Sequence, residues 1–246
     1  MKPNPDPTPN FNTIEGHNAL WQAGAEGETV DWYLMLKGFN SGGDFPLSAF
    51  PKELYNAFPD AKFVLTTRPS SKWYASIQNS ICFFDIKNTW QIQILTKLPF
   101  FPFSRIKGQQ TMINSMIKHK IGSGIPELDS WSAFCDPSNK ELAIKAYEAH
   151  NAFVKKIIPP ERLLMFETGA STYADLATFI GVPTPTSPYP RVNSKGEFAN
   201  LKIGLTVAAT FVLLVPLLFL GLLFGCLSRC CSTKGGVGEV KKAKGA

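Results

Sequence analysis

Residues Ala61 to Ser76, AKFVLTTRPSSKWYAS, decide the fold class of this 246-residue chain. A short run of strand-forming apolar residues, Phe63 to Leu65, follows a turn at Pro59-Asp60 and ends in two threonines. Such a run predicts a strand that is buried on both faces and central in a parallel sheet. Arg68 stands where the strand ends, and a helix is predicted after Ser71. The stretch therefore indicates an α/β domain.

Arg68 and Ser76 form a candidate anion site. In open α/β sheets, ligands bind just beyond the carboxyl ends of the strands, where Arg68 is predicted to lie. A planar guanidinium suits a phosphate, and Ser76, about two turns into the helix, could add a hydroxyl. The alternative is that Arg68 pairs with a surface carboxylate and Ser76 is an ordinary helix residue. From these residues alone, the alternative is favoured.

Composition and charge narrow the function classes. Hydrophobic residues make up 44% of the chain, enough for one α/β domain with a sizeable core plus an appendage. The net charge is +6, but five of the 25 basic residues follow Ser228 and the rest are scattered, which argues against nucleic-acid binding. Five cysteines are spaced neither as a disulfide framework nor as a metal site. They are Cys82, Cys135, Cys226, Cys230 and Cys231.

The remaining elements predict three layers, a parallel sheet with helices on both faces. Residues 1–16 are predicted to be a disordered, proline-rich leader, and residues 17–200 to be the domain. A second parallel strand is predicted over residues 162–166. Helices are predicted over residues 31–37, 46–58, 105–120, 141–157 and 172–180. The proline-broken segment 99–103, PFFPF, is expected to be a loop on the core or an aromatic lip over a pocket, which hints at an apolar acceptor.

Residues 203–227 predict a transmembrane helix. They contain no charged residue, and at ~1.5 Å per residue 25 residues exceed the ~30 Å hydrocarbon core. A buried core helix is the weaker alternative, because the segment has no polar face. Residues 228–246 form a basic tail, and Gly221 and Gly225 are a G-x-x-x-G candidate for a homodimer contact.

Five further segments follow the strand and Arg68 in a fixed order. They are SKWYAS (71–76), YEAHN (147–151), PPERLLMFE (159–167), FIGVPTP (179–185) and YPRVNSKGEF (189–198). Together these segments resemble the sulfotransferase-like family of P-loop proteins found in fungi, algae and bacteria, over roughly residues 17–198. The resemblance implies a P-loop-type α/β fold and the use, or ancestral use, of 3′-phosphoadenosine 5′-phosphosulfate (PAPS) as sulfo donor.

The resemblance also assigns donor-binding residues. In sulfotransferases an Arg after a strand and a Ser eight residues later bind the 3′-phosphate, a spacing that Arg68 and Ser76 match. The resemblance therefore favours the anion site over the alternative given above. An Arg-bearing loop often closes over the nucleotide in such enzymes, which makes Arg191, Asn193 and Lys195 further candidates.

One part of the family pattern is absent from this sequence. Such proteins open with a strand and a glycine-rich loop of the kind G-x-x-R-T-G-T, whose backbone N–H groups hold the 5′-phosphosulfate. Glycines such as Gly24 and Gly38 follow no apolar strand. The chain is therefore expected to be either a truncated product or a remnant without donor binding, and truncation is favoured because the rest of the pattern is present.

Two residues are candidates for the base that deprotonates the acceptor. Asp44 lies in a loop that enters the acceptor side in this family, although it could equally cap the following helix. His150 is the other candidate, although a hydrogen-bonded core histidine is the favoured interpretation there. The expected function is transfer of a sulfo group from PAPS to an acceptor hydroxyl. The alternatives are an inactive, membrane-tethered binding or scaffold protein and, less favoured, a nucleotide hydrolase.

Membrane orientation is predicted from two opposing arguments. Five basic residues follow the apolar segment and three precede it nearby, which favours a cytosolic tail. The tail cysteines suit S-palmitoylation, which also needs a cytosolic face. A PAPS-dependent domain with two isolated cysteines, by contrast, needs no oxidising compartment. The expectation from this last argument is a cytosolic domain.

Overall fold

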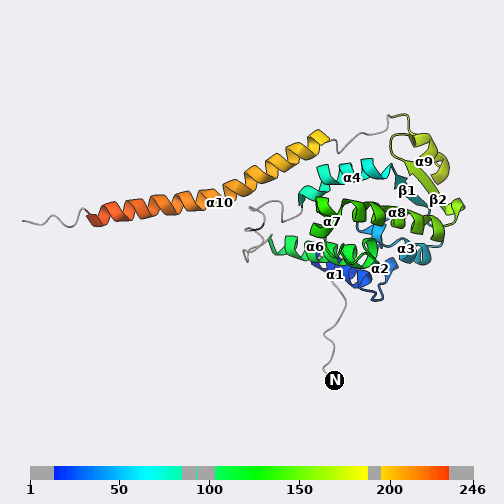
Figure 1. The fold of residues 1–246 in the computed structure, drawn as a ribbon, viewed down its shortest axis with the longest axis horizontal. Helices are drawn as coiled ribbons and strands as arrows, with labels where there is room; N and C mark the ends of the chain where they lie inside the picture. The colour runs from blue at the N-terminus through cyan, green and yellow to red at the C-terminus, as the bar shows by residue number, and fades with distance from the viewer. Residues whose placement is uncertain (1–13, 85–92, 94–102, 188–194, 233–246) are drawn as a thin grey trace, which may run out of the picture. The chain divides into compact units, whose positions relative to one another are not determined.

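The structure is a computed structural model that describes residues 14–84, 93, 103–187 and 195–232. It divides into two compact units, residues 1–199 and residues 200–246. Figure 1 follows the elements in chain order from blue to red. The helices are α1 (Ile14–Ala25), α2 (Trp32–Met35), α3 (Pro51–Ala57), α4 (Ser70–Asn79), α6 (Phe103–Met116), α7 (Trp131–Cys135), α8 (Lys140–Ile157), α9 (Tyr173–Ile180) and α10 (Lys195–Ser232). The strands are β1 (Phe63–Thr67) and β2 (Leu163–Glu167).

The predicted elements are present with small changes at their ends. Asp31 caps α2, because its carboxylate accepts a hydrogen bond from the Leu34 N–H. The helix predicted over residues 46–58 is instead a 3-10 turn, Leu47–Ala49, followed by α3. The helix predicted over residues 105–120 is α6 followed by a π-helical turn at Ile117–Ile121.

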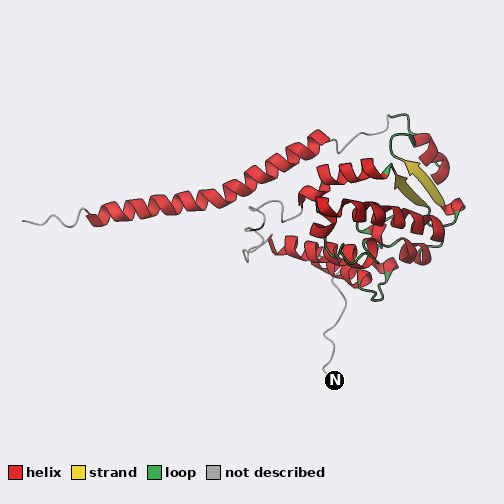
Figure 2. Ribbon diagram, viewed as in Figure 1, coloured by secondary structure: helices red, strands yellow, loops and turns green. Residues whose placement is uncertain are grey.

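β1 and β2 pair in parallel, as the order of elements predicted. Phe63 lies beside Leu163, and Thr67 lies beside Glu167. Figure 2, where strands are yellow, shows the two strands side by side among the helices. The prediction that β1 is buried on both faces is wrong, since Val64 is 41% exposed. Within the described part of the chain the parallel sheet has two strands, and the helices around it make this a mixed α/β structure.

Arg162 joins the beginnings of the two strands. Its Nε donates a hydrogen bond to the Ala61 carbonyl at 2.9 Å, and one terminal nitrogen donates to the Phe58 carbonyl at 2.7 Å. The guanidinium also lies over the Tyr55 ring, 4.5 Å from its centroid. One side chain therefore ties β2 to α3 and to the turn before β1, which fixes where the two strands begin relative to each other.

Two apolar clusters make up the core of the first unit. In one, Trp21, Trp32 and Phe50 pack ring against ring at centroid distances of 5.0 to 5.7 Å, and Phe50 is fully buried. In the other, residues of α4, α7 and α8 surround Leu128, which is also fully buried. Burial of this apolar area supplies most of the driving force for folding.

A disulfide between Cys82 and Cys135 crosses the second cluster. The two Cα atoms are 5.4 Å apart, and the residues are 3% and 4% exposed. Gln78 of α4 donates a hydrogen bond to the Cys135 carbonyl at 3.0 Å, which holds the end of α4 near the end of α7. The sequence analysis expected these two cysteines to be isolated, and that expectation is wrong. They are 53 residues apart, and the bond joins the 3-10 turn Ile81–Phe84, which follows α4, to the end of α7.

The second unit contains most of α10, which has a long apolar stretch. Residues Thr206–Phe224 are long and apolar enough to cross a membrane, judged by length and composition. Large side chains in this stretch are exposed within the structure, Leu222 at 74% and Phe224 at 76%. The helix continues through Pro216. This stretch lies inside the 203–227 segment that the sequence predicted.

Candidate functional site

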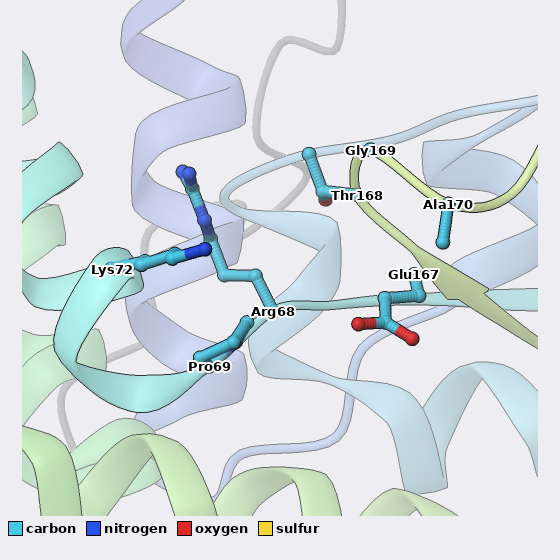
Figure 3. Close-up of a pocket in the computed structure, with 7 residues that line it drawn as sticks. All are labelled: Arg68, Pro69, Lys72, Glu167, Thr168, Gly169 and Ala170. Atoms are coloured by element: carbon cyan, nitrogen blue, oxygen red, sulfur yellow. The ribbon is translucent and has the colours of Figure 1, made fainter.

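A hollow of about 310 Å3 lies at the carboxyl ends of β1 and β2. β1 leads into Arg68 and Pro69, and Lys72 is on the first turn of α4 (Figure 3). β2 contributes the loop from Glu167 to Ala170. This is the edge of a parallel sheet where ligands bind in α/β proteins. Its position agrees with the position that the sequence predicted for an anion site.

The two strands shape the hollow through the loop that follows β2. Thr168 extends the ladder, because its N–H donates to the Thr67 carbonyl at 2.8 Å. Gly169 then adopts a φ of +96°, and a Cβ built there would meet nothing within 4 Å. Because side chains disfavour this φ and glycine does not, the loop can turn beside Arg68 without strain.

The hollow is cationic. The Arg68 Nε is buried and has no hydrogen-bond partner, and no ion pair in the described part of the chain involves Arg68 or Lys72. In Figure 3 the ends of these two side chains point toward the same region, and the Glu167 carboxylate points away from it. A buried polar atom without a partner is costly, and an anion placed here would satisfy it. The arrangement therefore suits a phosphate or sulfate group.

Tyr147 of α8 fixes the backbone of Arg68. The Arg68 N–H donates to the Tyr147 hydroxyl at 3.1 Å, and that hydroxyl donates to the Arg68 carbonyl at 3.1 Å. The Tyr147 ring stacks on Trp73 of α4 with centroids 4.2 Å apart, and Ser70 donates to Glu148 at 2.6 Å. α8 thus positions both Arg68 and the beginning of α4.

Removing two tyrosine hydroxyls should have different effects. We expect Tyr147→Phe to lower the free energy of unfolding by about 1–2 kcal/mol, because the Arg68 backbone loses both hydrogen bonds. Tyr74→Phe is the matched control: Tyr74 is 8% exposed and its hydroxyl has no described partner, so its removal should be neutral or stabilising. Thermal unfolding of the full-length chain in detergent measures both. Equal losses in the two variants would contradict the role given to Tyr147.

The structure does not bring Ser76 to the hollow. Ser76 lies on α4, half-buried, and its carbonyl accepts a hydrogen bond from the Ser80 hydroxyl at 2.7 Å. The hollow is lined instead by Lys72, which the sequence analysis did not select. The sequence contained a signal that could have identified Lys72, namely its position four residues after Arg68. A residue in the first turn of the helix that follows the strand stays near the end of that strand.

Asp44 is an exposed residue in a local turn. It has a φ of +62°, and its carboxylate accepts a hydrogen bond from the Phe45 N–H at 2.7 Å. Its carbonyl accepts from the Ser48 N–H at 3.0 Å, at the start of the 3-10 turn. Asp44 is not among the residues that line the hollow. These contacts are those of a turn-forming aspartate, and the role of Asp44 as base stays a prediction.

His150 lies half-buried on α8 and does not line the hollow. Burial lowers the pKa of His150 below its ordinary value. A lowered pKa keeps the imidazole neutral near neutral pH, which a general base requires. Its placement leaves its catalytic role a prediction as well.

The lowered pKa of His150 gives a pH dependence of stability. The unfolded chain binds a proton near the ordinary histidine pKa, and the folded chain binds it only at lower pH. Stability should therefore fall as the pH drops from about 6.5 through the folded-state pKa. Replacing His150 with Gln should flatten this part of the curve. Urea unfolding at a series of pH values tests this, and unchanged curves for His150→Gln would contradict it.

Three predicted residues fall at or beyond the described part of the domain. Arg191 and Asn193 lie outside the described residues, and Lys195 is the first residue of α10. The predicted aromatic lip lies outside as well, apart from Phe103 at the start of α6. Among the described residues no group of three or more His, Cys, Asp or Glu side chains could hold a metal ion.

Comparison with known proteins identifies the family. The model of the sulfotransferase domain matches residues 8–198, most of the chain. A similar protein, Ava biosynthesis cluster protein M of Aspergillus versicolor, is 26% identical over 162 residues. The match covers 66% of this chain and spans 57% of the length of that relative. The matched residues include the described strands and the cationic hollow at their carboxyl ends, and the chain therefore belongs to the sulfotransferase family.

Proposed function

We propose that this protein transfers a sulfo group from PAPS to an acceptor hydroxyl, and that Arg68 and Lys72 bind the 3′-phosphate of the donor. The observation that carries the proposal is the pair of cations without described ion-pair partners at the carboxyl ends of parallel strands. Membership of the sulfotransferase family supports the same donor class. It also supports a P-loop-type arrangement for the domain, of which β1 and β2 form part.

The residues of the hollow fit a phosphate group. The Arg68 fork can donate two hydrogen bonds to phosphate oxygens, and its buried Nε then gains a partner. Lys72 adds a second positive charge from the first turn of α4. When bound, PAPS supplies an activated sulfo group.

Tyr147 and the loop after β2 position the groups that are proposed to bind the donor. Tyr147 holds the Arg68 backbone, so the guanidinium starts from a fixed Cα position, which lowers the ordering cost of binding. Arg191, Asn193 and Lys195 are proposed to add contacts to the donor. Asp44 and His150 are the proposed bases for the acceptor proton.

Nucleotide binding tests the donor site. We expect adenosine 3′,5′-bisphosphate to bind the full-length chain, and Arg68→Ala to weaken binding about 10- to 100-fold, the scale of a lost charge-assisted hydrogen bond. Lys72→Ala should weaken it less, because Lys binds phosphate as a point charge. Lys140→Ala, whose exposed side chain pairs with Glu141 at 3.8 Å, is the control and should have no effect. Titration calorimetry in detergent measures all four proteins.

Adenosine 5′-monophosphate, which lacks the 3′-phosphate, shows whether Arg68 acts on that group alone. It should bind wild type and Arg68→Ala alike, since it lacks the group that Arg68 is proposed to contact. Equal affinities of wild type and Arg68→Ala for the bisphosphate would contradict the assignment.

A membrane-tethered binding protein is the second candidate. It would bind an anion in the same cationic hollow and carry the same apolar helix, without transferring the sulfo group. Nucleotide binding without sulfo transfer from PAPS to a phenol would support it.

We also propose that residues 203–227 anchor the protein in a membrane. The apolar stretch Thr206–Phe224 supports this, as does its bracketing by Lys202 and Arg229. A G-x-x-x-G pair, Gly221 and Gly225, is the proposed homodimer contact within the bilayer.

A further inference from the structure

The disulfide between Cys82 and Cys135 indicates which kind of compartment the domain occupies. They are bonded to each other within the apolar core, at 3% and 4% exposure. Disulfides persist in oxidising compartments and are rare in the cytosol, where thiols are kept reduced. The bond therefore argues against a cytosolic location of the domain.

The remaining cysteines lie at and beyond the carboxyl end of the proposed anchor. Cys226 is the second-last residue of the anchor, residues 203–227, and Cys230 and Cys231 follow it. With this segment as one membrane span, Cys230 and Cys231 would lie on the opposite side of the membrane from Cys82 and Cys135.

The distribution of basic residues gives an independent argument. Five basic residues follow the apolar stretch, and three precede it within the nearby sequence. Flanks rich in Lys and Arg favour the cytosolic side of a membrane. The residues after the stretch are Arg229, Lys234, Lys241, Lys242 and Lys244, and those before it are Arg191, Lys195 and Lys202. The charge difference and the disulfide therefore point to the same orientation.

We propose that the domain faces the oxidising lumen of the secretory pathway and that the basic tail faces the cytosol. This inference rests on the proposed membrane anchor, but not on nucleotide binding or sulfo transfer. It reverses the cytosolic orientation that the sequence analysis expected on the ground that two cysteines were isolated. The disulfide forms by exchange: the Cys82 and Cys135 thiols lose two protons and two electrons, and a disulfide of a lumenal oxidoreductase is reduced to two thiols.

An engineered glycosylation acceptor tests the orientation of the domain. Gly27→Asn creates the acceptor Asn-Glu-Thr with Glu28 and Thr29 in an exposed turn. Gly27 has a φ of +92°, which asparagine tolerates better than most residues, and a Cβ there meets nothing within 4 Å. The matched control adds Thr29→Ala, which removes the acceptor and keeps Gly27→Asn. A second acceptor is placed in a C-terminal tag on a flexible spacer, and the full-length chain is expressed in a eukaryotic cell.

We expect one glycan on the Gly27→Asn chain, removable by endoglycosidase, none on the Thr29→Ala control, and none on the C-terminal tag. A glycan on the tag with an unmodified domain would overturn the orientation. Two unmodified acceptors on a chain that resists alkaline carbonate extraction would overturn it as well. Release of the chain by carbonate would instead overturn the proposed membrane anchor. The extraction therefore distinguishes failure of the anchor from failure of the orientation.

Thiol counting gives a second readout. After hydroxylamine treatment to free any acylated thiols, maleimide-polyethylene glycol should add three adducts to the denatured, unreduced chain and five after reduction. The Cys82→Ser, Cys135→Ser double variant should show three in both conditions. Five adducts on the unreduced wild-type chain would contradict an oxidised domain.

Discussion

Replacing both Cys82 and Cys135 with serine should lower the free energy of unfolding by about 4 kcal/mol. The reason is that the disulfide restricts the unfolded chain, and a loop of this length loses that much conformational entropy, expressed as free energy, when it is closed. The bond joins residues 53 positions apart, so its loss frees a large set of unfolded conformations. For a domain of this size, the expected fall in melting temperature is about 10 °C.

Three comparisons isolate the bond itself. Reducing the wild-type chain should produce most of the same loss without changing any side-chain volume. The Cys82→Ala, Cys135→Ala variant avoids placing hydroxyls in a site that is 3–4% exposed, so it should lose no more than the serine variant. Serine at Cys226, Cys230 and Cys231 should leave the melting temperature unchanged. A double variant that melts with the wild type would show that the bond contributes nothing to stability.

Arg162→Ala should lower the free energy of unfolding by about 3 kcal/mol, the scale expected for lost hydrogen bonds from a charged donor. Two backbone carbonyls, of Phe58 and Ala61, lose their described guanidinium donors. The Tyr55 ring loses a cation 4.5 Å from its centroid, which adds to the cost. Urea unfolding of the full-length chain measures the change.

Arg162→Lys is the matched control, because it keeps the charge and loses the planar fork. One ammonium group cannot reproduce both hydrogen bonds together with the stacking on Tyr55, so we expect an intermediate loss. If Arg162→Lys is no more stable than Arg162→Ala, the positive charge contributes nothing and the stabilisation comes from the planar guanidinium and its contacts. Stability of Arg162→Ala equal to wild type would remove the role given to this residue in joining the strands.

The elements that the sequence predicted well depend on local signals. β1 follows from a run of strand formers bounded by a turn and by Arg68, and the cap of α2 follows from Asp31. The parallel pairing of β1 with β2 follows from the helices between them, since parallel strands need a crossover. These features required no knowledge of distant contacts.

The features that the sequence did not predict depend on distant contacts. The exposure of Val64 is set by the number of strands beside β1, which the run itself does not encode. The disulfide joins the turn after α4 to the end of α7, across 53 positions of sequence. Tyr147 was noted as part of a motif, but its contact with the Arg68 backbone joins residues 79 positions apart.

The disulfide also changes what proteolytic processing can do to this protein. Cys82 and Cys135 close a covalent ring over the residues between them, which include α6. A single backbone cut inside this ring leaves two polypeptides that stay joined through sulfur, and they separate only after reduction. The N-terminal piece, with Arg68 and Lys72, would therefore remain attached to the piece that carries Tyr147, and the halves of the anion site would stay on one particle.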